Sequence, residues 1–358
     1  MTMYQRGLLP LSADPITHGH LDLVRQAGSH CHELVIMVSV NPDKTPTLKD
    51  EDRLKLTQKC VADFCPDIHG RVILTEDLLT DVYLRESCDV IFRGARDALD
   101  VEYEALQTHY HNLVLPGIVD KTIILAADPK LAHIQSSAVR NFARKHMFCT
   151  EMVPVAVQAR LWRRIHDQKV IGIMGDPLAI YDVAEGISDR IGQLAKWPVR
   201  IVDMAALEKA MQADPCPGCV DLVSLMGGKN IFQQTDPDVV KLWMNLMSRF
   251  YRTWMNKASH RGIMLVVFPD IFSFGMMHWV NNNVVYVTDD RRVSPNNTVM
   301  LSPTNTTPFG QQVKDEIADI QVQQQTECYG TLIQHDMVND QVADTGNQIH
   351  DLIRAGII

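Results

Sequence analysis

Residues 12–20 read Ser12-Ala13-Asp14-Pro15-Ile16-Thr17-His18-Gly19-His20 and stand between two segments of contrasting pattern. Residues 7–11 are largely apolar, as in a buried strand, and residues 18–28 have the pattern of an amphipathic helix. The chain is therefore expected to turn at Pro15 and to enter a helix whose first turn contains His20. Amides and the dipole at a helix N-terminus attract phosphate oxygens, and an imidazole there can donate a hydrogen bond to charge developing on a transferring phosphoryl group. Two interpretations stay open: a phosphate site, or a capped helix with surface histidines.

Strand and helix patterns alternate along the rest of the first half. Strands are expected at 33–40, 71–74, 88–92 and 121–127, and helices at 49–64, 99–113, 136–146 and 153–165. Most of these strands are nearly continuous apolar runs, which is typical of parallel strands buried on both faces. Strands separated by helices of this length indicate βαβ units around a parallel sheet.

A charged break at residues 166–169 (HDQK) is the expected domain boundary. A second alternation follows, with strands expected at 170–174, 199–202, 263–268 and 284–288 and helices at 178–194 and 237–257. Residues 294–325 are polar and are expected to form a loop or lid. The sequence therefore predicts two tandem α/β domains with parallel sheets, residues 1–166 and residues 168–358.

Composition narrows the function classes. The 358 residues carry 34 Lys and Arg against 43 Asp and Glu, a net charge of −9, which disfavours a basic nucleic-acid binder. No apolar run approaches the ~20 residues that span a bilayer, and the first residues do not read as a signal peptide. Eight scattered cysteines are too few for a disulfide scaffold and fit a reducing compartment. We expect a cytoplasmic protein that does not bind membranes.

One close cysteine pair occurs, Cys216-Pro217-Gly218-Cys219. A four-ligand zinc site needs a second pair, and the sequence has none. A redox pair remains an alternative to two ordinary thiols in a loop, which is the reading we prefer.

Two further segments fit phosphate recognition. Arg93-Gly94-Ala95-Arg96 follows a predicted strand, and arginines at the carboxyl end of a strand suit phosphate oxygens. Ser136 and Ser137 begin a predicted helix, where hydroxyls serve either as N-caps or as phosphate ligands, with Arg140 one turn further on. Glu104, near the first segment, could equally lie on a solvated helix face.

Taken together, DPITHGHLD (14–22), FRGARDALDVEYE (92–104) and IQSSAVR (134–140) resemble the phosphopantetheine adenylyltransferases of the T/HxGH nucleotidyltransferase superfamily. The resemblance covers residues 3–163 in the family's order and spacing. It implies a Rossmann-like domain that transfers AMP from ATP, used with Mg²⁺, to 4′-phosphopantetheine, releasing pyrophosphate and forming dephospho-coenzyme A. Which residues would ligate the metal is unknown.

The resemblance also assigns roles by position. His20 would stabilise the transition state and contact ATP. The other ATP contacts would be Ser12, Thr17, Gly94, Arg96, Glu104, Ser136 and Ser137. The acceptor, a small phosphorylated molecule, would contact Ser12, Lys44, Leu79 and Arg93.

Three positions depart from the family pattern. Leu11 replaces a glycine near the nucleotide, where a side chain would crowd the site. Ala13 replaces an aromatic residue, and Gln135 replaces the first of three serines. The alternatives are therefore an inactive scaffold that keeps these folds, or an adenylyltransferase for another small phosphate such as nicotinamide mononucleotide.

The second half resembles dephospho-coenzyme A kinase, which follows the adenylyltransferase in bifunctional coenzyme A synthase. Residues 170–175 (VIGIMG), 218–232 and 268–275 (FPDIFSFG) match its segments in order. A P-loop needs a lysine and a hydroxyl, yet Tyr181 and Asp182 stand at those positions, and Asp176 would repel phosphate. Asp203-Met204-Ala205 lacks the second acid of the family's DAD, and Leu222 replaces an arginine. We expect a degenerate, non-catalytic kinase-like domain; the alternative is an unrelated α/β unit.

An aromatic and methionine stripe runs along the long predicted helix 237–257, at Trp243, Met247, Phe250, Tyr251 and Trp254. Such a stripe is expected in a core, or else at an interface with a partner protein or a second copy. A homo-oligomer or protein partner bound through the second domain therefore remains open.

Overall fold

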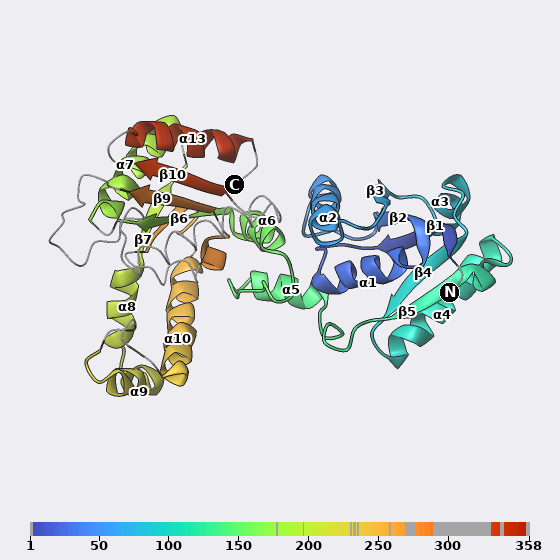
Figure 1. Ribbon diagram of the computed structural model, residues 1–358, viewed down its shortest axis with the longest axis horizontal. Helices are drawn as coiled ribbons and strands as arrows, with labels where there is room; N and C mark the ends of the chain where they lie inside the picture. The colour runs from blue at the N-terminus through green and yellow to red at the C-terminus, as the bar shows by residue number, and fades with distance from the viewer. Residues whose placement is uncertain are drawn as a thin grey trace. The chain divides into compact units, whose positions relative to one another are not determined.

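The computed structural model describes residues 3–176, 178–195, 197–229, 231, 234, 236–257, 259–268, 277–281, 283–288, 331–336 and 340–355. The chain forms two compact units (Figure 1). The first comprises Met1–Arg144 and Cys149–Ile165, and the second Lys145–Phe148 and His166–Ile358. The expected division differs from this one at residues 145–148 and at His166, all of which belong to the second unit.

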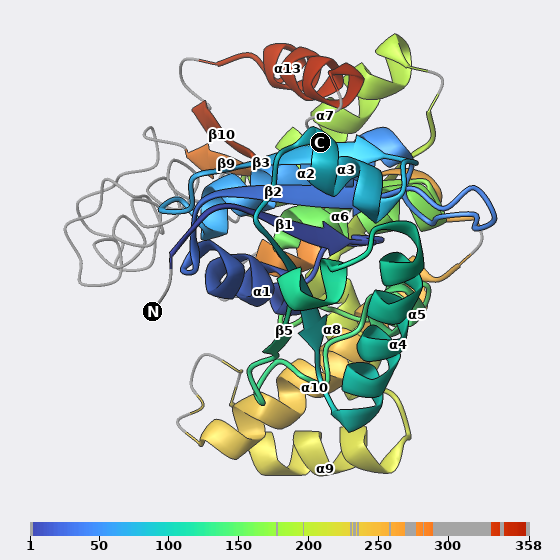
Figure 2. The ribbon, with the colours of Figure 1, turned by 90° about the vertical axis from the view of Figure 1, so that its right-hand side faces the viewer.

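The first unit is a doubly wound parallel sheet with strand order β3-β2-β1-β4-β5. Its strands are β1 (Tyr4–Leu11), β2 (Cys31–Ser39), β3 (Gly70–Thr75), β4 (Val90–Ala95) and β5 (Thr122–Ala126). Its helices are α1 (His18–Gly28), α2 (Asp50–Phe64), α3 (Leu79–Arg85), α4 (Ala98–Val114), η1 (Ile118–Lys121), α5 (Ser136–Ala143) and α6 (Val155–His166, of which His166 belongs to the second unit). Figure 2 shows β1, β2 and β3 side by side. The predicted Rossmann-like α/β fold is confirmed.

Local sequence explains where α1 begins. Thr17 has extended backbone angles, and its hydroxyl accepts the amide of His20, so it is the N-cap that a helix start requires. Leu21, Val24 and Ala27 form the buried face of α1 at helical spacing. Helix α1 packs on the sheet over β1 and β2.

Two expectations for the first unit were incomplete. Strand β4 continues to Ala95, so Arg93 and Gly94 lie within the strand rather than after it. Helix α3 was not predicted, because seven residues are too few to show a helical period.

The second unit is another parallel sheet, with order β10-β9-β6-β8-β7. Its strands are β6 (Gln168–Gly175), β7 (Val199–Asp203), β8 (Gly262–Val267), β9 (Asn283–Thr288) and β10 (Thr331–Asp336). Its helices are α7 (Ile180–Leu194), α8 (Met204–Gln212), α9 (Pro217–Met226), α10 (Pro237–Met255), η3 (Met277–Val280) and α13 (Val342–Arg354). Helices α7 and α13 pack side by side on one face of this sheet, and α8, α9 and α10 project from it as a helical arm (Figure 1). Two parallel α/β units are thus confirmed.

Several expectations for the second unit change. Gln168 and Lys169 are buried residues of β6, so the break lies at Asp167, whose φ is +55°. Strand β10 and helices α8, α9 and α13 were not predicted as such. The expected loop 294–325 and residues 269–275 of the FPDIFSFG segment lie outside the described residues.

The stripe on α10 is largely core. Trp243, Met247 and Tyr251 are buried, which confirms the core alternative for these three, whereas Phe250 and Trp254 are half-buried. None of the helices among the described residues is long and apolar enough to cross a bilayer.

Candidate active site

A cavity of about 1170 Å³ opens at the carboxyl ends of β1 and β4 in the first unit. The strand order reverses between these two strands, and doubly wound sheets bind ligands at this switch point. Side chains of α1, α2, α4 and α5 and of the loop after β2 complete its wall. The topology therefore places a ligand site where the sequence motifs meet.

His20 is the third residue of α1 and lines this cavity. Its Nδ1 lies 3.1 Å from the Thr17 backbone nitrogen and 3.1 Å from the Thr17 hydroxyl oxygen. Because a backbone N–H can only donate, Nδ1 must be the acceptor, and the proton of the neutral ring is assigned to Nε2. The reciprocal cap between Thr17 and His20 thus fixes both the tautomer and the ring orientation.

The electrostatics keep this ring neutral. Desolvation, followed by the positive charge of Arg96, lowers the pKa of His20 to about 4. At neutral pH the imidazole is therefore a fixed, uncharged hydrogen-bond donor.

The helix itself offers fewer free amides than the sequence suggested. The His18 amide donates to the Met152 carbonyl at 2.9 Å, and the His20 amide donates to the Thr17 hydroxyl at 3.3 Å. Of the first three residues of α1, His18 and His20 therefore use their amides within the protein.

Two arginines reach the cavity from β4 and the turn after it, each held by a carboxylate of α4. Arg93 Nε donates to Glu104 at 2.5 Å, and both side chains are largely buried. Arg96 makes a two-pronged pair with Asp100, at 2.6 and 3.1 Å. The pairing raises the pKa of Arg96 and lowers that of Asp100, so both groups stay charged near neutral pH.

Asp14 organises the turn before α1. Its two carboxylate oxygens accept the amides of Thr47 and Leu48 at 2.9 and 3.0 Å, which ties the loop carrying Lys44 to the turn. Arg140 Nη1 donates to the Asp14 carbonyl and lies 3.7 Å from its carboxylate. These contacts bring three segments far apart in sequence to one edge of the sheet.

Arg53 joins the ends of the two central strands. It is buried, with 4% of the side chain exposed, and Nη2 donates to the carbonyls of Ser12 and Ser39, the latter at 2.6 Å. Its Nη1 donates to Asp50 at 2.8 Å. Arg53 thus holds Ser12 in place through the backbone.

Helix α5 closes another side of the cavity. The Ser136 hydroxyl donates to the Pro15 carbonyl at 2.9 Å, so this serine anchors the helix to the turn. Ser137 is exposed on the cavity wall, and no side chain caps the helix start at Gln135.

Ten of the eleven predicted contact residues line this one cavity: Ser12, Thr17, His20, Lys44, Arg93, Gly94, Arg96, Glu104, Ser136 and Ser137. Leu79 does not. It is buried at the start of α3, in a core cluster with Leu8, Val35 and Met37. The structure thus places the Leu79 side chain in the core beneath the sheet, apart from the other ten, and a substrate contact there stays a prediction.

Sequence reasoning missed some cavity residues. Asp14, Arg53 and Asp100 were not identified, although Asp14 lay in the quoted motif. A Cβ on Gly94 would come within 2.3 Å of a Leu23 methyl, so packing against Leu23 also favours glycine at this position. Leu11 lines the cavity, but only 7% of it is exposed, so it takes little of the space.

Four of the five acids that line the cavity are already engaged. Asp14, Asp50, Asp100 and Glu104 each bind a backbone amide or an arginine. Among the described residues, no group of three potential metal ligands lies at this cavity. A divalent ion that enters with ATP would be held mainly by phosphate oxygens.

Known proteins match the same part of the chain. A family model described as Cytidylyltransferase-like matches residues 12–142. The phosphopantetheine adenylyltransferase of Parvibaculum lavamentivorans is 30% identical over 169 residues, 47% of this chain and 98% of the relative. Those of Clostridium perfringens strain 13 (34% over 159 residues, 44% of this chain, 94% of the relative) and Synechococcus sp. RCC307 (36% over 165 residues, 46% and 96%) are similar.

A crystal structure of NadR protein in complex with NR covers 98% of this chain and 97% of that chain, at 12% identity and a TM-score of 0.33. That score is too low to support a conclusion about this chain.

The fold, the cavity and these matches define the class: the first unit is a nucleotidyltransferase, which confirms the prediction of an enzyme of this type. More narrowly, the chain belongs to the phosphopantetheine adenylyltransferase family. The relatives cover less than half of the chain, so they bear on the first unit alone, and the kinase-like reading of the second has no support from them.

Proposed function

We propose that the first unit transfers AMP from ATP to the phosphate of 4′-phosphopantetheine and releases pyrophosphate. The observation that carries the proposal is the neutral His20, fixed by Thr17 in one cavity with Arg93, Arg96 and Lys44. The relatives named phosphopantetheine adenylyltransferase share this part of the chain.

The reaction needs positioning and charge stabilisation rather than a covalent intermediate. An oxygen of the acceptor phosphate attacks the α-phosphorus of ATP, and the bond to the pyrophosphate oxygen breaks in line. The His20 Nε2–H donates to a non-bridging oxygen on which negative charge grows. Because the pKa of His20 is about 4, the ring keeps this role without losing or gaining a proton near neutral pH.

To bind the phosphates, Arg93 and Arg96 would exchange hydrogen bonds to their carboxylate partners, Glu104 and Asp100, for hydrogen bonds to phosphate oxygens. Arg96 is an exposed residue near His20, and Asp100 holds it in a forked geometry that suits phosphate oxygens equally well. We assign Arg96, Ser136 and Ser137 to ATP, and Lys44 and Arg93 to the acceptor phosphate. Mg²⁺ would enter with ATP and reduce its charge.

The acceptor is tested directly. The full chain, with ATP and Mg²⁺, is offered 4′-phosphopantetheine or nicotinamide mononucleotide, and the adenylylated product is identified by mass. We expect dephospho-coenzyme A to form at least about tenfold faster than the nicotinamide product. A difference of this size corresponds to one or more hydrogen bonds made only in the transition state with 4′-phosphopantetheine. Preference for the nucleotide would replace the proposed acceptor, and no product from either would favour the inactive scaffold.

We propose that the second unit does not catalyse phosphoryl transfer. In the turn after β6, one Asp176 carboxylate oxygen accepts the amides of Leu178 and Ala179, at 2.8 and 3.3 Å. A phosphate-binding loop would offer such amides to the nucleotide. Tyr181, at the position expected for lysine, donates to Asp203 at 3.1 Å. The groups that would meet a triphosphate are thus engaged with one another.

Self-association is proposed through the first unit rather than through α10. Leu99, Tyr103, Leu106, Tyr110 and Leu113 follow heptad spacing along α4 and are 48–80% exposed. An exposed apolar stripe at this spacing suits the same stripe of a second copy. Sedimentation velocity should show a species larger than the 40.4 kDa monomer that Leu106→Glu reduces to the monomer. A monomeric wild-type chain at tens of micromolar would contradict this.

A further inference from the structure

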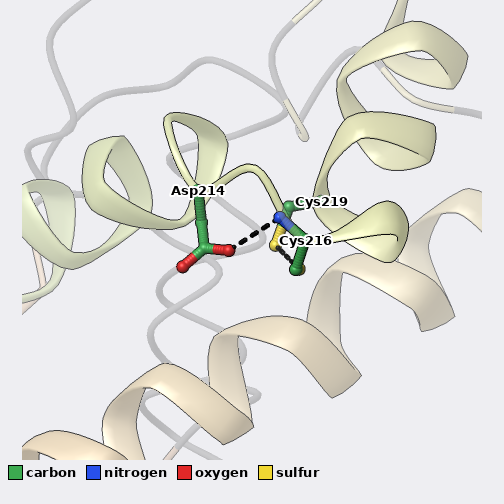
Figure 3. A group of neighbouring side chains, drawn as sticks. All are labelled: Asp214, Cys216 and Cys219. Atoms are coloured by element: carbon green, nitrogen blue, oxygen red, sulfur yellow. Dashed lines mark hydrogen bonds between the residues drawn. The ribbon is translucent and has the colours of Figure 1, made fainter.

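Two cysteines meet at the tip of the helical arm, far in sequence from the adenylyltransfer motifs. Cys216 is the N-cap of α9, Pro217 is its first residue, and Cys219 lies in its first turn (Figure 3). Their sulfur atoms are 2.8 Å apart. Among the described residues, the other cysteines are all buried: Cys31, Cys60, Cys65, Cys88 and Cys149.

The two thiols differ in access. Cys216 is half-buried, whereas Cys219 is fully buried. Burial, with the neighbouring Cys216 sulfur, raises the pKa of Cys219 to about 11. A reagent from solution therefore reaches Cys216 first, and Cys219 can react only through Cys216.

Asp214 fixes the turn that carries the two cysteines, and charged groups of both signs lie near their sulfur atoms. Asp214 accepts the Cys216 amide at 2.9 Å, as Figure 3 shows, which holds the first cysteine at the helix start. Arg249 Nη1 lies 4.0 Å from Cys216 Sγ, which stands at the N-terminus of α9. The Asp214 carboxylate lies within 4.8 Å of both sulfurs.

The alternative use of this cluster is a metal site, since Asp214, Cys216 and Cys219 could each give one ligand atom. Two thiolates on a tetrahedral zinc ion, each ~2.3 Å away, would be about 3.8 Å apart. The observed sulfurs are 1.0 Å closer than that, nearer to the ~2.05 Å of a disulfide. Among the described residues only three ligands converge, one of which already accepts a backbone amide. The geometry therefore favours sulfur–sulfur chemistry.

We propose that Cys216 and Cys219 form a reversible redox site that exchanges with small-molecule disulfides. The Cys216 thiolate attacks one sulfur of the oxidant, RSSR, and RS⁻ leaves with the electron pair of the broken bond. The Cys219 thiol then gives up its proton and attacks Cys216 Sγ, and the second RS⁻ leaves. One disulfide becomes two RSH while the protein loses two hydrogens, so atoms and electrons balance.

The test uses the full chain in buffers with graded ratios of reduced to oxidised glutathione, followed by rapid alkylation and peptide mass mapping. The peptide with residues 216 and 219 should pass from under about a tenth to over about nine tenths disulfide across that range, as expected for a CxxC pair. Cys149, a buried cysteine of the same chain, should stay reduced throughout. A Cys216–Cys219 peptide that never oxidises would overturn the proposal.

Two variants test the order of attack. Cys219→Ser should accumulate one glutathione on Cys216, because nothing resolves the mixed disulfide, whereas Cys216→Ser should leave Cys219 unmodified. Equal glutathione adducts on both variants would contradict the assigned roles.

A zinc titration of the reduced chain distinguishes the redox site from a metal site. We expect no stoichiometric binding at micromolar zinc that depends on these two cysteines. One tightly bound zinc that is lost in Cys216→Ser and shields both thiols from glutathione would identify a metal site and refute the redox proposal.

Discussion

His20 is held in one tautomer by Thr17 and is kept neutral by its surroundings. The Thr17 amide and hydroxyl occupy Nδ1, and desolvation with Arg96 lowers the pKa to about 4. The cap that starts α1 thus also orients the His20 ring. The lowered pKa of His20 also makes the stability of the fold depend on pH.

The folded His20 pKa lies below its ordinary value of 6.5, so between about pH 4 and 6.5 the unfolded chain binds more protons than the folded one. Stability contributed at His20 is therefore present above pH 6.5 and is lost as the pH falls toward 4. From pH 7 to 5 we expect a loss of about 2 kcal/mol that His20→Gln does not show, because glutamine can still complete the cap. Urea unfolding of both proteins at the two pH values measures this difference. Equal losses of stability in both proteins would mean that the pKa of His20 is not lowered in the folded state.

Two glycines of the site have separable roles. A Cβ at Gly19 would make only ordinary contacts, the nearest with the Thr17 hydroxyl at 3.6 Å, whereas a Cβ at Gly94 would press on Leu23. We expect Gly94→Ala to cost about 1–3 kcal/mol of stability through overpacking.

Gly19→Ala should leave stability unchanged or raise it by up to about 1 kcal/mol, since alanine favours the helix. Its AMP transfer should nevertheless fall, because a methyl group obstructs the approach of phosphate. Thermal melts with activity assays compare the pair. A fully active Gly19→Ala would show that phosphate does not approach this backbone.

At the scale of elements, Arg53 of α2 joins β1 to β2 by donating to Ser12 and Ser39. Lysine keeps the charge but cannot bridge two carbonyls and Asp50 at once. Each hydrogen bond to a charged group is worth about 1.5–3 kcal/mol, so Arg53→Lys should destabilise the chain by at least that much. Arg71→Lys is the matched control, because this exposed arginine pairs with Glu33 and Glu86 on the surface, where such pairs contribute ~0–1 kcal/mol. Similar melting temperatures for the two variants would contradict the role given to Arg53.

Which elements could be predicted follows from how they are buried. Strands β2, β6 and β8 are central and apolar along most of their length, and helix α1 has a clear period and cap, so all four were predicted within two residues. Strand β10 forms the edge of its sheet and carries His335, a buried polar residue bonded to Thr345, so its pattern is not that of a central strand.

The residues of the candidate site likewise fall into those that the sequence could predict and those that it could not. Residues in contiguous motifs, such as Thr17, His20 and Arg96, could be found from sequence. Arg53 could not, because its role is to donate to carbonyls of distant residues, which leaves no local pattern. Leu79 was assigned by position alone, and the fold uses it as core.

At the scale of the whole molecule, the two units should contribute unequally to chemistry. Asp176 already binds the amides that a phosphate would need, so the second unit should not phosphorylate dephospho-coenzyme A. A carboxylate 4 Å from a phosphate costs about 4 kcal/mol per unit charge at an effective dielectric near 20. With γ-labelled ATP and dephospho-coenzyme A, the full chain should give no labelled coenzyme A. Labelled product that persists in the His20→Ala variant would place kinase activity in the second unit.

Pyrophosphate release from ATP and 4′-phosphopantetheine tests whether His20 stabilises the transition state of AMP transfer. His20→Ala is compared with His18→Ala, a neighbour that lies outside the cavity wall and is 3.3 Å from the Thr150 carbonyl. Loss of one donor to developing charge is worth roughly 3–4 kcal/mol, so His20→Ala should lower kcat by about 10²–10³ with the KM for ATP nearly unchanged, and His18→Ala should stay within about threefold of wild type. A His20→Ala enzyme with near wild-type kcat would show that His20 does not stabilise the transition state.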